Sequence, residues 1–226
     1  MNNMDIKLLL SAISKFVFGF VLVALLVFMS AGTLSYLNGW ILIFVMFVPM
    51  FLAGLFMFLK NPVLLKRRLT LREKQTEQKF AVIFSAIMFV CGFIVSGICY
   101  RYEILIVPVW VSIVFSLVFL TGYILYGIVL CENEYLSRNI EVLDGQKVID
   151  KGLYGIVRHP MYFATVLMFM SIPLILGTLS AGFVFLFYPF IIVFRIRGEE
   201  KLLERDLSGY TQYKEKVKYR MIPFIW

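Results

Sequence analysis

The chain has 226 residues, of which 61% are hydrophobic and 16% are charged, and its formal net charge is +8. This composition excludes an ordinary soluble domain, in which about 25% of residues are charged. It also does not favour nucleic-acid binding, because no soluble basic domain is left to carry it, whereas contact with anionic lipid accounts for the positive charge.

Four stretches of the sequence lack Asp, Glu, Lys and Arg: residues 16–59, 80–100, 104–131 and 160–194. A helix needs about 20 residues to cross a bilayer core of about 30 Å. The first stretch therefore holds two spans, with a break near residues 32–39, and the next two hold one each. The fourth is tight for two full crossings, which predicts a short or tilted helical hairpin turning at Gly177-Thr178. About six transmembrane segments result.

The distribution of basic residues predicts the orientation. If the N-terminus lies inside, the inner segments 1–15, 60–79, 132–159 and 195–226 hold 21 of the 22 Lys and Arg residues. The positive-inside rule then places both termini on the cytoplasmic side. Residues 66–68 lie in a predicted basic loop, which either anchors this topology or recruits anionic lipid head groups.

The ends of the chain complete the predicted architecture. The N-terminal apolar run is longer than a usual signal-peptide core and leads straight into another span, which favours a retained helix. Beyond residue 198, apolar residues recur every three or four positions, which predicts a C-terminal amphipathic helix on the inner membrane surface. We predict one all-α integral-membrane domain, with transmembrane helices in residues 1–131 and a cofactor-binding catalytic region in residues 132–226.

Metal chemistry is not favoured by the sequence. The chain has three cysteines, without a Cys-x-x-Cys pair, and a single histidine. A zinc site needs four such ligands, or three and a water, at suitable spacing. We therefore predict no metal.

Two polar clusters bracket the predicted hairpin. His159 lies between Arg158 and Pro160 directly before the last apolar stretch, and Arg195, Glu199 and Glu200 follow it. The two ends of a hairpin lie on the same side of the membrane, so the clusters should meet there. Arg195 and Glu199 share one helix face, and a charge at the end of a span is expensive unless it has a role. The alternative interpretation is a packed interfacial histidine and acids that complement a helix dipole.

The order and spacing of these residues resemble the isoprenylcysteine carboxyl methyltransferase family, within the wider group of small integral-membrane methyltransferases that includes phospholipid N-methyltransferases. The residues that carry the resemblance are Gly145-Gln146-Lys147-Val148-Ile149, Gly152-x-Tyr154, Arg158-His159-Pro160-x-Tyr162, Arg195-x-x-x-Glu199-Glu200 and Gly209-Tyr210-x-x-Tyr213. The resemblance covers residues 141–226. Leu153 and Ala164 stand where family members often carry proline and glycine, and both changes are mild.

The resemblance implies S-adenosylmethionine as methyl donor and S-adenosylhomocysteine as product, held without the dinucleotide-binding fingerprint, which this sequence lacks. On matched positions it implies a cofactor pocket lined by Gln146, Lys147, Val148, Ile149, Tyr154, His159, Pro160, Met161, Tyr162 and Glu199, with Arg195 facing the methyl acceptor. An amine, thiol or phenol acceptor would need a general base, for which Glu200 and His159 are candidates. The predicted catalytic residues are therefore Arg195 and Glu200.

The predicted function is transfer of a methyl group from S-adenosylmethionine to a lipophilic acceptor that enters from the bilayer. An isoprenylcysteine carboxylate is the preferred acceptor on the family resemblance alone. A phospholipid amine, a small thiol and a quinone-like phenol stay open, as does a non-enzymatic membrane protein that retains the fold. The expected partners are the acceptor and membrane lipids, without nucleic acid or metal, and the cytoplasmic side is expected to hold the active site.

Overall fold

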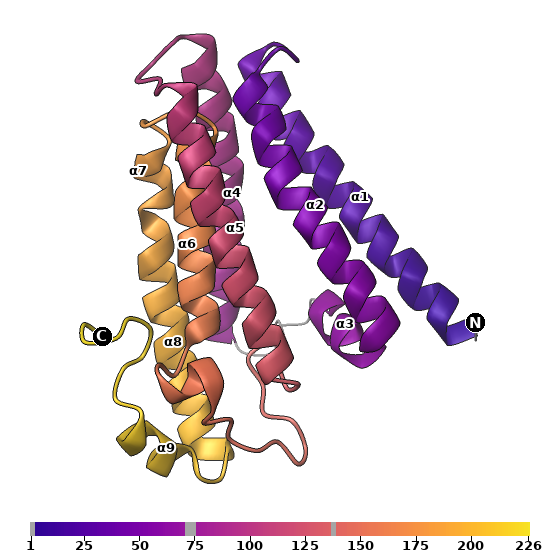
Figure 1. The fold of residues 1–226 in the computed structure, drawn as a ribbon, viewed down its shortest axis with the longest axis vertical. Coiled ribbons are helices and arrows are strands. Elements are labelled where there is room, and N and C mark those ends of the chain that lie inside the picture. The colour runs from indigo at the N-terminus through magenta and orange to yellow at the C-terminus, as the bar shows by residue number, and fades with distance from the viewer. Residues whose placement is uncertain (1–2, 71–75, 137–138) are drawn as a thin grey trace.

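The computed structural model describes residues 3–70, 76–136 and 139–226, and every regular element in these ranges is helical (Figure 1). The elements are α1 (Asn3–Ala31), α2 (Leu37–Lys60), α3 (Pro62–Leu69), α4 (Thr76–Arg101), α5 (Val109–Glu132), a 3-10 turn (Gly152–Gly155), α6 (Pro160–Ile175), α7 (Gly182–Phe185), α8 (Phe187–Asp206) and α9 (Tyr210–Lys216). The helices α1, α2, α4 and α5 are long and apolar enough to cross a membrane. These findings confirm an all-α, multi-pass integral membrane protein.

The long helices form two groups that diverge at one end. Helices α4, α5, α6 and α8 lie together, and α1 and α2 lie beside them and lean away toward the N-terminal end (Figure 1). Helix α1 packs on α4, and α2 packs on α5. The short helix α3, the inner loop after α5 and the helix α9 all lie at the end where the two groups diverge.

The final hairpin turns where the sequence predicted. Gly177 adopts a positive φ of 72° between α6 and α7, a conformation that glycine reaches without strain. The Val107 amide donates to the Gly177 carbonyl at 2.9 Å, and the Leu179 amide donates to the Leu105 carbonyl at 3.0 Å. The tip of the hairpin is thus paired with the segment that directly precedes α5.

At the opposite end of the hairpin, α6 begins nearer the middle of the helix bundle than the level at which α5 ends. Gly122 on α5 packs against α6, where a Cβ would lie 2.9 Å from the Ala164 carbonyl. The same Cβ would lie 3.2 Å from the Met168 amide nitrogen, so Gly122 is level with about residue 166 of α6. The two helices run antiparallel, which brings His159 level with about residue 129 of α5. Helix α5 continues to Glu132, and His159 therefore lies about 4 Å nearer the middle of the helix bundle than the end of α5.

Two local predictions are corrected by the structure. Residues 66–68 belong to α3 and not to a loop, because Pro62 starts that helix and the Asn61 side chain caps it by accepting from the Leu64 amide at 3.0 Å. The prediction of a single C-terminal amphipathic helix beyond residue 198 is also wrong. Helix α8 continues to Asp206, and Gly209, with a φ of 86°, separates it from α9.

The apolar side chains around α9 are covered by protein. They form one cluster with the inner loop and the end of α8, made of Leu207, Tyr210, Tyr213 and Val217 packed with Val142, Val148 and Leu203. The three- and four-residue periodicity therefore reports packing on residues 142–148, which lie more than 50 positions earlier in the chain. Sequence periodicity alone does not distinguish this partner from a membrane surface.

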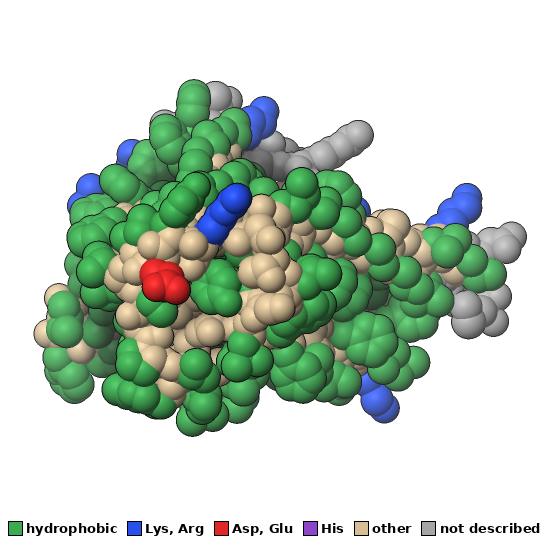
Figure 2. Space-filling view, turned by 90° about the horizontal axis from the view of Figure 1, so that it is seen from above, with side chains coloured by type: hydrophobic (Ala, Val, Ile, Leu, Met, Phe, Trp, Pro, Cys, Tyr) green, Lys and Arg blue, Asp and Glu red, His purple; other side chains and the backbone are tan. Residues whose placement is uncertain are grey.

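Figure 2 shows the end of the molecule that carries the α4–α5 connection and the hairpin tip. Its surface is mostly hydrophobic side chains and backbone, with few charged side chains in view. The basic residues predicted to lie inside belong to segments at the other end. The polar loops that form a pocket are found there too.

Candidate functional site

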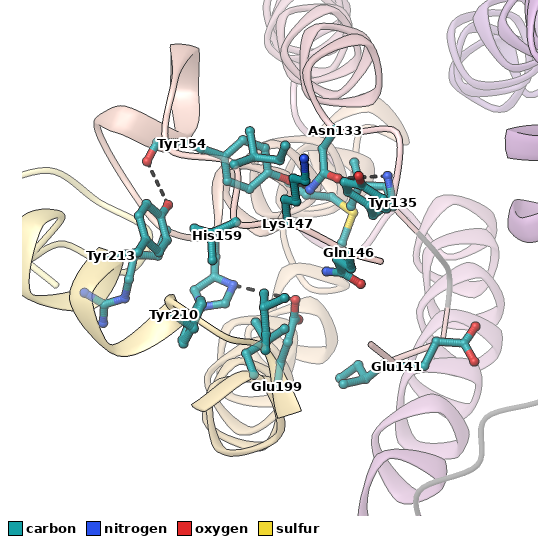
Figure 3. A pocket seen from close by; sticks show the side chains of 18 of the residues that line it. Asn133, Tyr135, Glu141, Gln146, Lys147, Tyr154, His159, Glu199, Tyr210 and Tyr213 are labelled. Atoms are coloured by element: carbon teal, nitrogen blue, oxygen red, sulfur yellow. Dashed lines mark hydrogen bonds and ion pairs between the residues drawn. The ribbon is translucent and has the colours of Figure 1, made fainter. Parts of the chain in front are cut away.

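One pocket collects most of the polar side chains that the sequence singled out (Figure 3). Its empty space is about 860 Å³ when its open mouth is included. Its walls come from the loop after α5, the 3-10 turn, the start of α6, α8 and α9. The lining residues are Asn133, Tyr135, Leu136, Asn139, Ile140, Glu141, Gln146, Lys147, Val148, Ile149, Tyr154, Arg158, His159, Met161, Tyr162, Arg195, Glu199, Leu203, Leu207, Tyr210 and Tyr213.

The 3-10 turn positions Tyr154 on one wall. The Glu132 carboxylate at the end of α5 accepts from the Leu153 amide at 3.0 and 3.2 Å. Gly152 permits this approach, since it has a φ of 60° and a Cβ there would lie 2.0 Å from a Glu132 oxygen. The Tyr154 hydroxyl accepts from the Asn133 side chain at 3.0 Å, and the Tyr154 carbonyl accepts from the Tyr213 hydroxyl at 2.7 Å (Figure 3).

Behind the pocket lies a buried charge cluster centred on Glu200. Arg158 donates to Glu200 through Nε at 2.7 Å, and Arg220 donates to its other oxygen at 2.8 Å. The side chains of Arg158 and Glu200 are only 3% and 5% exposed. Burial opposes ionisation of Glu200, but the hydrogen bonds from His159, Arg220 and Arg158 hold the pKa of its carboxyl well below the ordinary value.

The segment after α9 holds the start of α6 in place. The Arg158 amide donates to the Tyr219 carbonyl at 3.0 Å, and the His159 amide donates to the Arg220 carbonyl at 2.7 Å. The Arg158 guanidinium also donates to the carbonyls of Val217 and Lys218 at 2.7 and 2.9 Å. These contacts hold His159 in a non-helical conformation, with φ −129° and ψ 59°, and the following proline disfavours the helical region at this residue.

A second polar cluster connects α6 with α8 at the pocket. The Tyr162 hydroxyl donates to Glu199 Oε2 at 2.7 Å and accepts from Arg195 Nε at 3.4 Å. His159 Nδ1 lies 4.0 Å from Glu199 Oε1 (Figure 3). We call Tyr162, Arg195 and Glu199 the α6–α8 cluster. It places an anionic, a cationic and a phenolic group side by side.

The pocket also holds a polar atom that a ligand could engage. The Tyr210 hydroxyl is buried and has no hydrogen-bond partner within the described part of the chain. Buried polar atoms are usually paired, so such an atom at a pocket points to a polar ligand. Burial raises the pKa of Tyr154, Tyr210 and Tyr213, which keeps these phenols protonated as donors at neutral pH.

The structure places the sequence-predicted residues as follows. The pocket wall contains Gln146, Lys147, Val148, Ile149, Tyr154, His159, Met161, Tyr162, Arg195 and Glu199. Pro160 does not line it and instead begins α6 at the first helical position. Glu200 does not line it either, since both of its oxygens face the arginines behind the wall.

Several lining residues were not predicted. Tyr210 and Tyr213 belong to a motif that carried the family resemblance, so a signal for them existed although no role was assigned. Asn133, Tyr135 and Glu141 come from the part of the loop after α5 that precedes the Gly145–Ile149 motif, and this part carried no motif. Only the folding of this loop across the start of α6 brings them to the pocket.

Residues 112–205 match the model of the isoprenylcysteine carboxyl methyltransferase (ICMT) family, which supports the resemblance seen in the sequence. The match runs from α5 almost to the end of α8 and includes His159 and the α6–α8 cluster. It supports a membrane methyltransferase. Methyltransferases of this family generally depend on S-adenosylmethionine.

The chain is also similar to a mouse protein of another description, Delta(14)-sterol reductase TM7SF2 from Mus musculus. The two are 30% identical over 90 residues, which is 38% of this chain and 22% of the mouse protein. The chain thus matches about a fifth of the length of this curated relative.

Proposed function

We propose that this protein transfers a methyl group from S-adenosylmethionine to the carboxylate of a lipophilic acceptor, with an isoprenylcysteine as the leading candidate. The observation that carries the proposal is the α6–α8 cluster, which joins the two ends of the hairpin in one pocket. The family match supports the methyltransferase part. The acceptor is inferred from the charges and the depth of the pocket.

The pocket residues fit the chemical groups of S-adenosylmethionine. The cofactor supplies a methyl group on a cationic sulfonium and also carries an ammonium, a carboxylate and an adenine. Glu199 can accept from the ammonium or from ribose hydroxyls, and Tyr210 offers a buried hydroxyl without a described partner. A tyrosine face stabilises a nearby cation by about 0.5–2 kcal/mol. Residues 146–149 and Tyr154 form the remaining cofactor wall.

A carboxylate acceptor needs no general base. A carboxylate oxygen can attack the methyl carbon without losing a proton, so orientation and proximity supply most of the rate. Arg195 suits that orientation, because a guanidinium binds a carboxylate through two parallel hydrogen bonds. Glu200, whose oxygens are engaged by two arginines, is assigned here to positioning the Arg158–His159 segment and not to proton transfer.

The depth of the pocket supports an acceptor from the bilayer. His159 lies about 4 Å inward from the end of α5, so a chain that lies among the helices reaches the pocket with its head group alone. The charge distribution favours the cytoplasmic side for this pocket. A water-soluble cofactor then enters from the loops and the acceptor from the lipid.

A second candidate follows from the mouse relative, whose printed activity is reduction of a sterol. A reductase needs a hydride donor, typically a nicotinamide nucleotide. The geometry of the α6–α8 cluster alone does not distinguish a site for S-adenosylmethionine from a site for a nicotinamide nucleotide. Comparing the affinities of S-adenosylmethionine and of nicotinamide nucleotides for one purified sample distinguishes the candidates.

The proposal is tested with protein purified into lipid nanodiscs. Isothermal titration with S-adenosylmethionine should show binding that Glu199→Gln and His159→Ala each weaken by about tenfold. Glu204→Gln on the exposed part of α8 is the matched control and should leave binding unchanged. Undiminished binding in both pocket variants would overturn the assignment.

The acceptor is identified with a radiolabelled methyl donor and a panel of lipid acceptors. Label on a carboxylate forms an ester, which mild base releases as methanol, whereas label on an amine or thioether resists base. Base-labile transfer to an S-prenylcysteine supports the proposal. Label that appears only on phospholipid amines, small thiols or phenols moves the assignment to those acceptors.

A further inference from the structure

The imidazole of His159 lies between the carboxylates of two consecutive residues of α8 (Figure 3). Its Nε2 lies 3.4 Å from Glu200 Oε1, and its Nδ1 lies 4.0 Å from Glu199 Oε1. Glu200 belongs to the buried cluster behind the pocket, whereas Glu199 and His159 line the pocket. The ring therefore connects the buried cluster with the ligand side of the wall.

The two distances assign the proton of the neutral ring. A neutral imidazole carries one N–H, and the contact made by one nitrogen decides which nitrogen holds it. The pKa of Glu200 lies well below its ordinary value, so this carboxylate is ionised at neutral pH and only accepts hydrogen bonds. The contact at 3.4 Å favours an N–H at Nε2, whereas Glu199 at 4.0 Å lies beyond hydrogen-bond distance of Nδ1.

Nδ1 and Glu199 Oε1 then form a pair of hydrogen-bond acceptors at the pocket. An unprotonated ring nitrogen and a carboxylate oxygen cannot bond to each other, because neither carries a hydrogen. The other oxygen of Glu199 accepts from the Tyr162 hydroxyl at 2.7 Å, and Oε1 faces the ring. Across a gap of 4.0 Å, one ligand group with two or more hydrogens can donate to both atoms.

The chemistry of this acceptor pair selects one group of S-adenosylmethionine. The carboxylate of the cofactor has no hydrogen to donate and would be repelled by Glu199. Each ribose hydroxyl donates only one hydrogen bond. The ammonium group carries three N–H donors and a positive charge, so it can donate to both atoms and form a charge-assisted hydrogen bond with Glu199.

We propose that Glu200 is a positioning residue, which fixes His159 as the tautomer protonated at Nε2 so that Nδ1 and Glu199 together accept from the ammonium group of S-adenosylmethionine. The identity of this ligand rests on the proposed function. The tautomer does not, because it is a property of the protein without ligand. An acid that does not line the pocket thus controls cofactor binding through the ring.

The tautomer can be read directly because the chain has a single histidine. The protein is labelled with ¹⁵N-histidine, purified through a tag that contains no histidine, and placed in lipid nanodiscs for NMR. At about pH 8, Nδ1 should give the signal of an unprotonated ring nitrogen and Nε2 that of an N–H. A protonated Nδ1 in the unliganded protein would overturn the inference.

Glu200→Gln tests the positioning role, since it removes the charge and keeps the shape of the side chain. It should move the ring toward the tautomer protonated at Nδ1 and weaken binding of S-adenosylmethionine at least about tenfold. Glu204→Gln is the matched control, because Glu204 pairs with Lys214 at the exposed part of α8. It should change neither the spectrum nor the affinity. An unchanged tautomer in Glu200→Gln would remove the role of Glu200.

The ligand group is tested with two analogues of S-adenosylhomocysteine, one without the amino group and one without the carboxylate. Loss of the amino group should weaken binding to the unchanged protein at least about tenfold, and His159→Ala should remove most of this difference. The analogue that keeps the amino group should also shift the Nδ1 signal, and the analogue without it should not. These measurements decide the ligand even if Glu200→Gln does not fold.

The possible failures can be told apart. If His159→Ala instead removes the penalty of the missing carboxylate, the ring binds that carboxylate and the assignment of the ammonium is wrong. If S-adenosylhomocysteine binds well and loss of its amino group has no effect, this inference fails alone. If the unchanged protein binds neither S-adenosylmethionine nor S-adenosylhomocysteine, the proposed function fails and the ligand assignment fails with it.

Discussion

Replacing Glu200 should destabilise the protein more than replacing any exposed acid of α8. In Glu200→Ala, the guanidinium of Arg158, whose side chain is 3% exposed, loses its carboxylate partner inside the protein. Removing one partner of a buried ion pair costs about 3–5 kcal/mol. The second partner, Arg220, is 31% exposed, so water compensates most of its loss and adds at most about 1 kcal/mol.

The lower end of this range, about 3 kcal/mol, corresponds to a decrease in Tm of about 6–12 °C for a chain of this size. The assay is thermal unfolding in detergent at neutral pH, followed by tryptophan fluorescence. Glu204→Ala is the control, because Glu204 pairs with Lys214 and both side chains are more than a third exposed. It should shift Tm by less than about 2 °C.

The comparison with Arg220 tests the reasoning about burial. Arg220→Gln should lower Tm by only a few degrees, because its partner Glu200 keeps the stronger contact with Arg158. A Glu200→Ala protein that unfolds within about 2 °C of the unchanged protein would show that the buried cluster does not stabilise the fold. Equal losses in Glu200→Ala and Glu204→Ala would refute the role given to burial.

Three further outcomes are expected. Tyr210→Phe should weaken binding of S-adenosylmethionine by about three- to tenfold in titration and leave Tm unchanged, because the lost hydroxyl has no described partner in the protein. The folded pKa of Glu200 lies below its ordinary value of 4.5, so its ionised form stabilises the fold above pH 4.5 and this contribution is lost as the pH falls further. The Tm values of the unchanged protein and Glu200→Gln should therefore converge below pH 4.5, and a constant difference would contradict this. Gly152→Ala should lower Tm measurably, because the added Cβ meets Glu132 and the backbone has a positive φ; an unchanged Tm would show that the turn adjusts without cost.

The membrane helices could be predicted because long stretches without charge have one physical solution in lipid. The break between α1 and α2 and the turn at Gly177 also left local signals in glycine and polar residues. The division of α8 from α9 was missed. The apolar periodicity continues past Gly209, and the packing partner of α9 lies in residues 142–148, which no local pattern reveals.

The candidate site shows the same division between local and distant signals. His159, Arg195 and Glu199 stood out because polar residues next to a span are costly and their spacing matched a family. The role of Glu200 could not be read from the sequence, since it depends on Arg158 and Arg220, which reach it from both directions along the chain.

The recessed start of α6 has an energetic consequence for a prenylated acceptor. If the pocket opened level with the end of α5, the acceptor would have to withdraw roughly 4 Å of its chain from hydrocarbon into water. That length is about three methylene groups at ~0.8 kcal/mol each, or about 2.4 kcal/mol, which is about fiftyfold in apparent affinity. A pocket set inside the bundle lets the protein recognise the head group while the hydrocarbon tail keeps its lipid solvation.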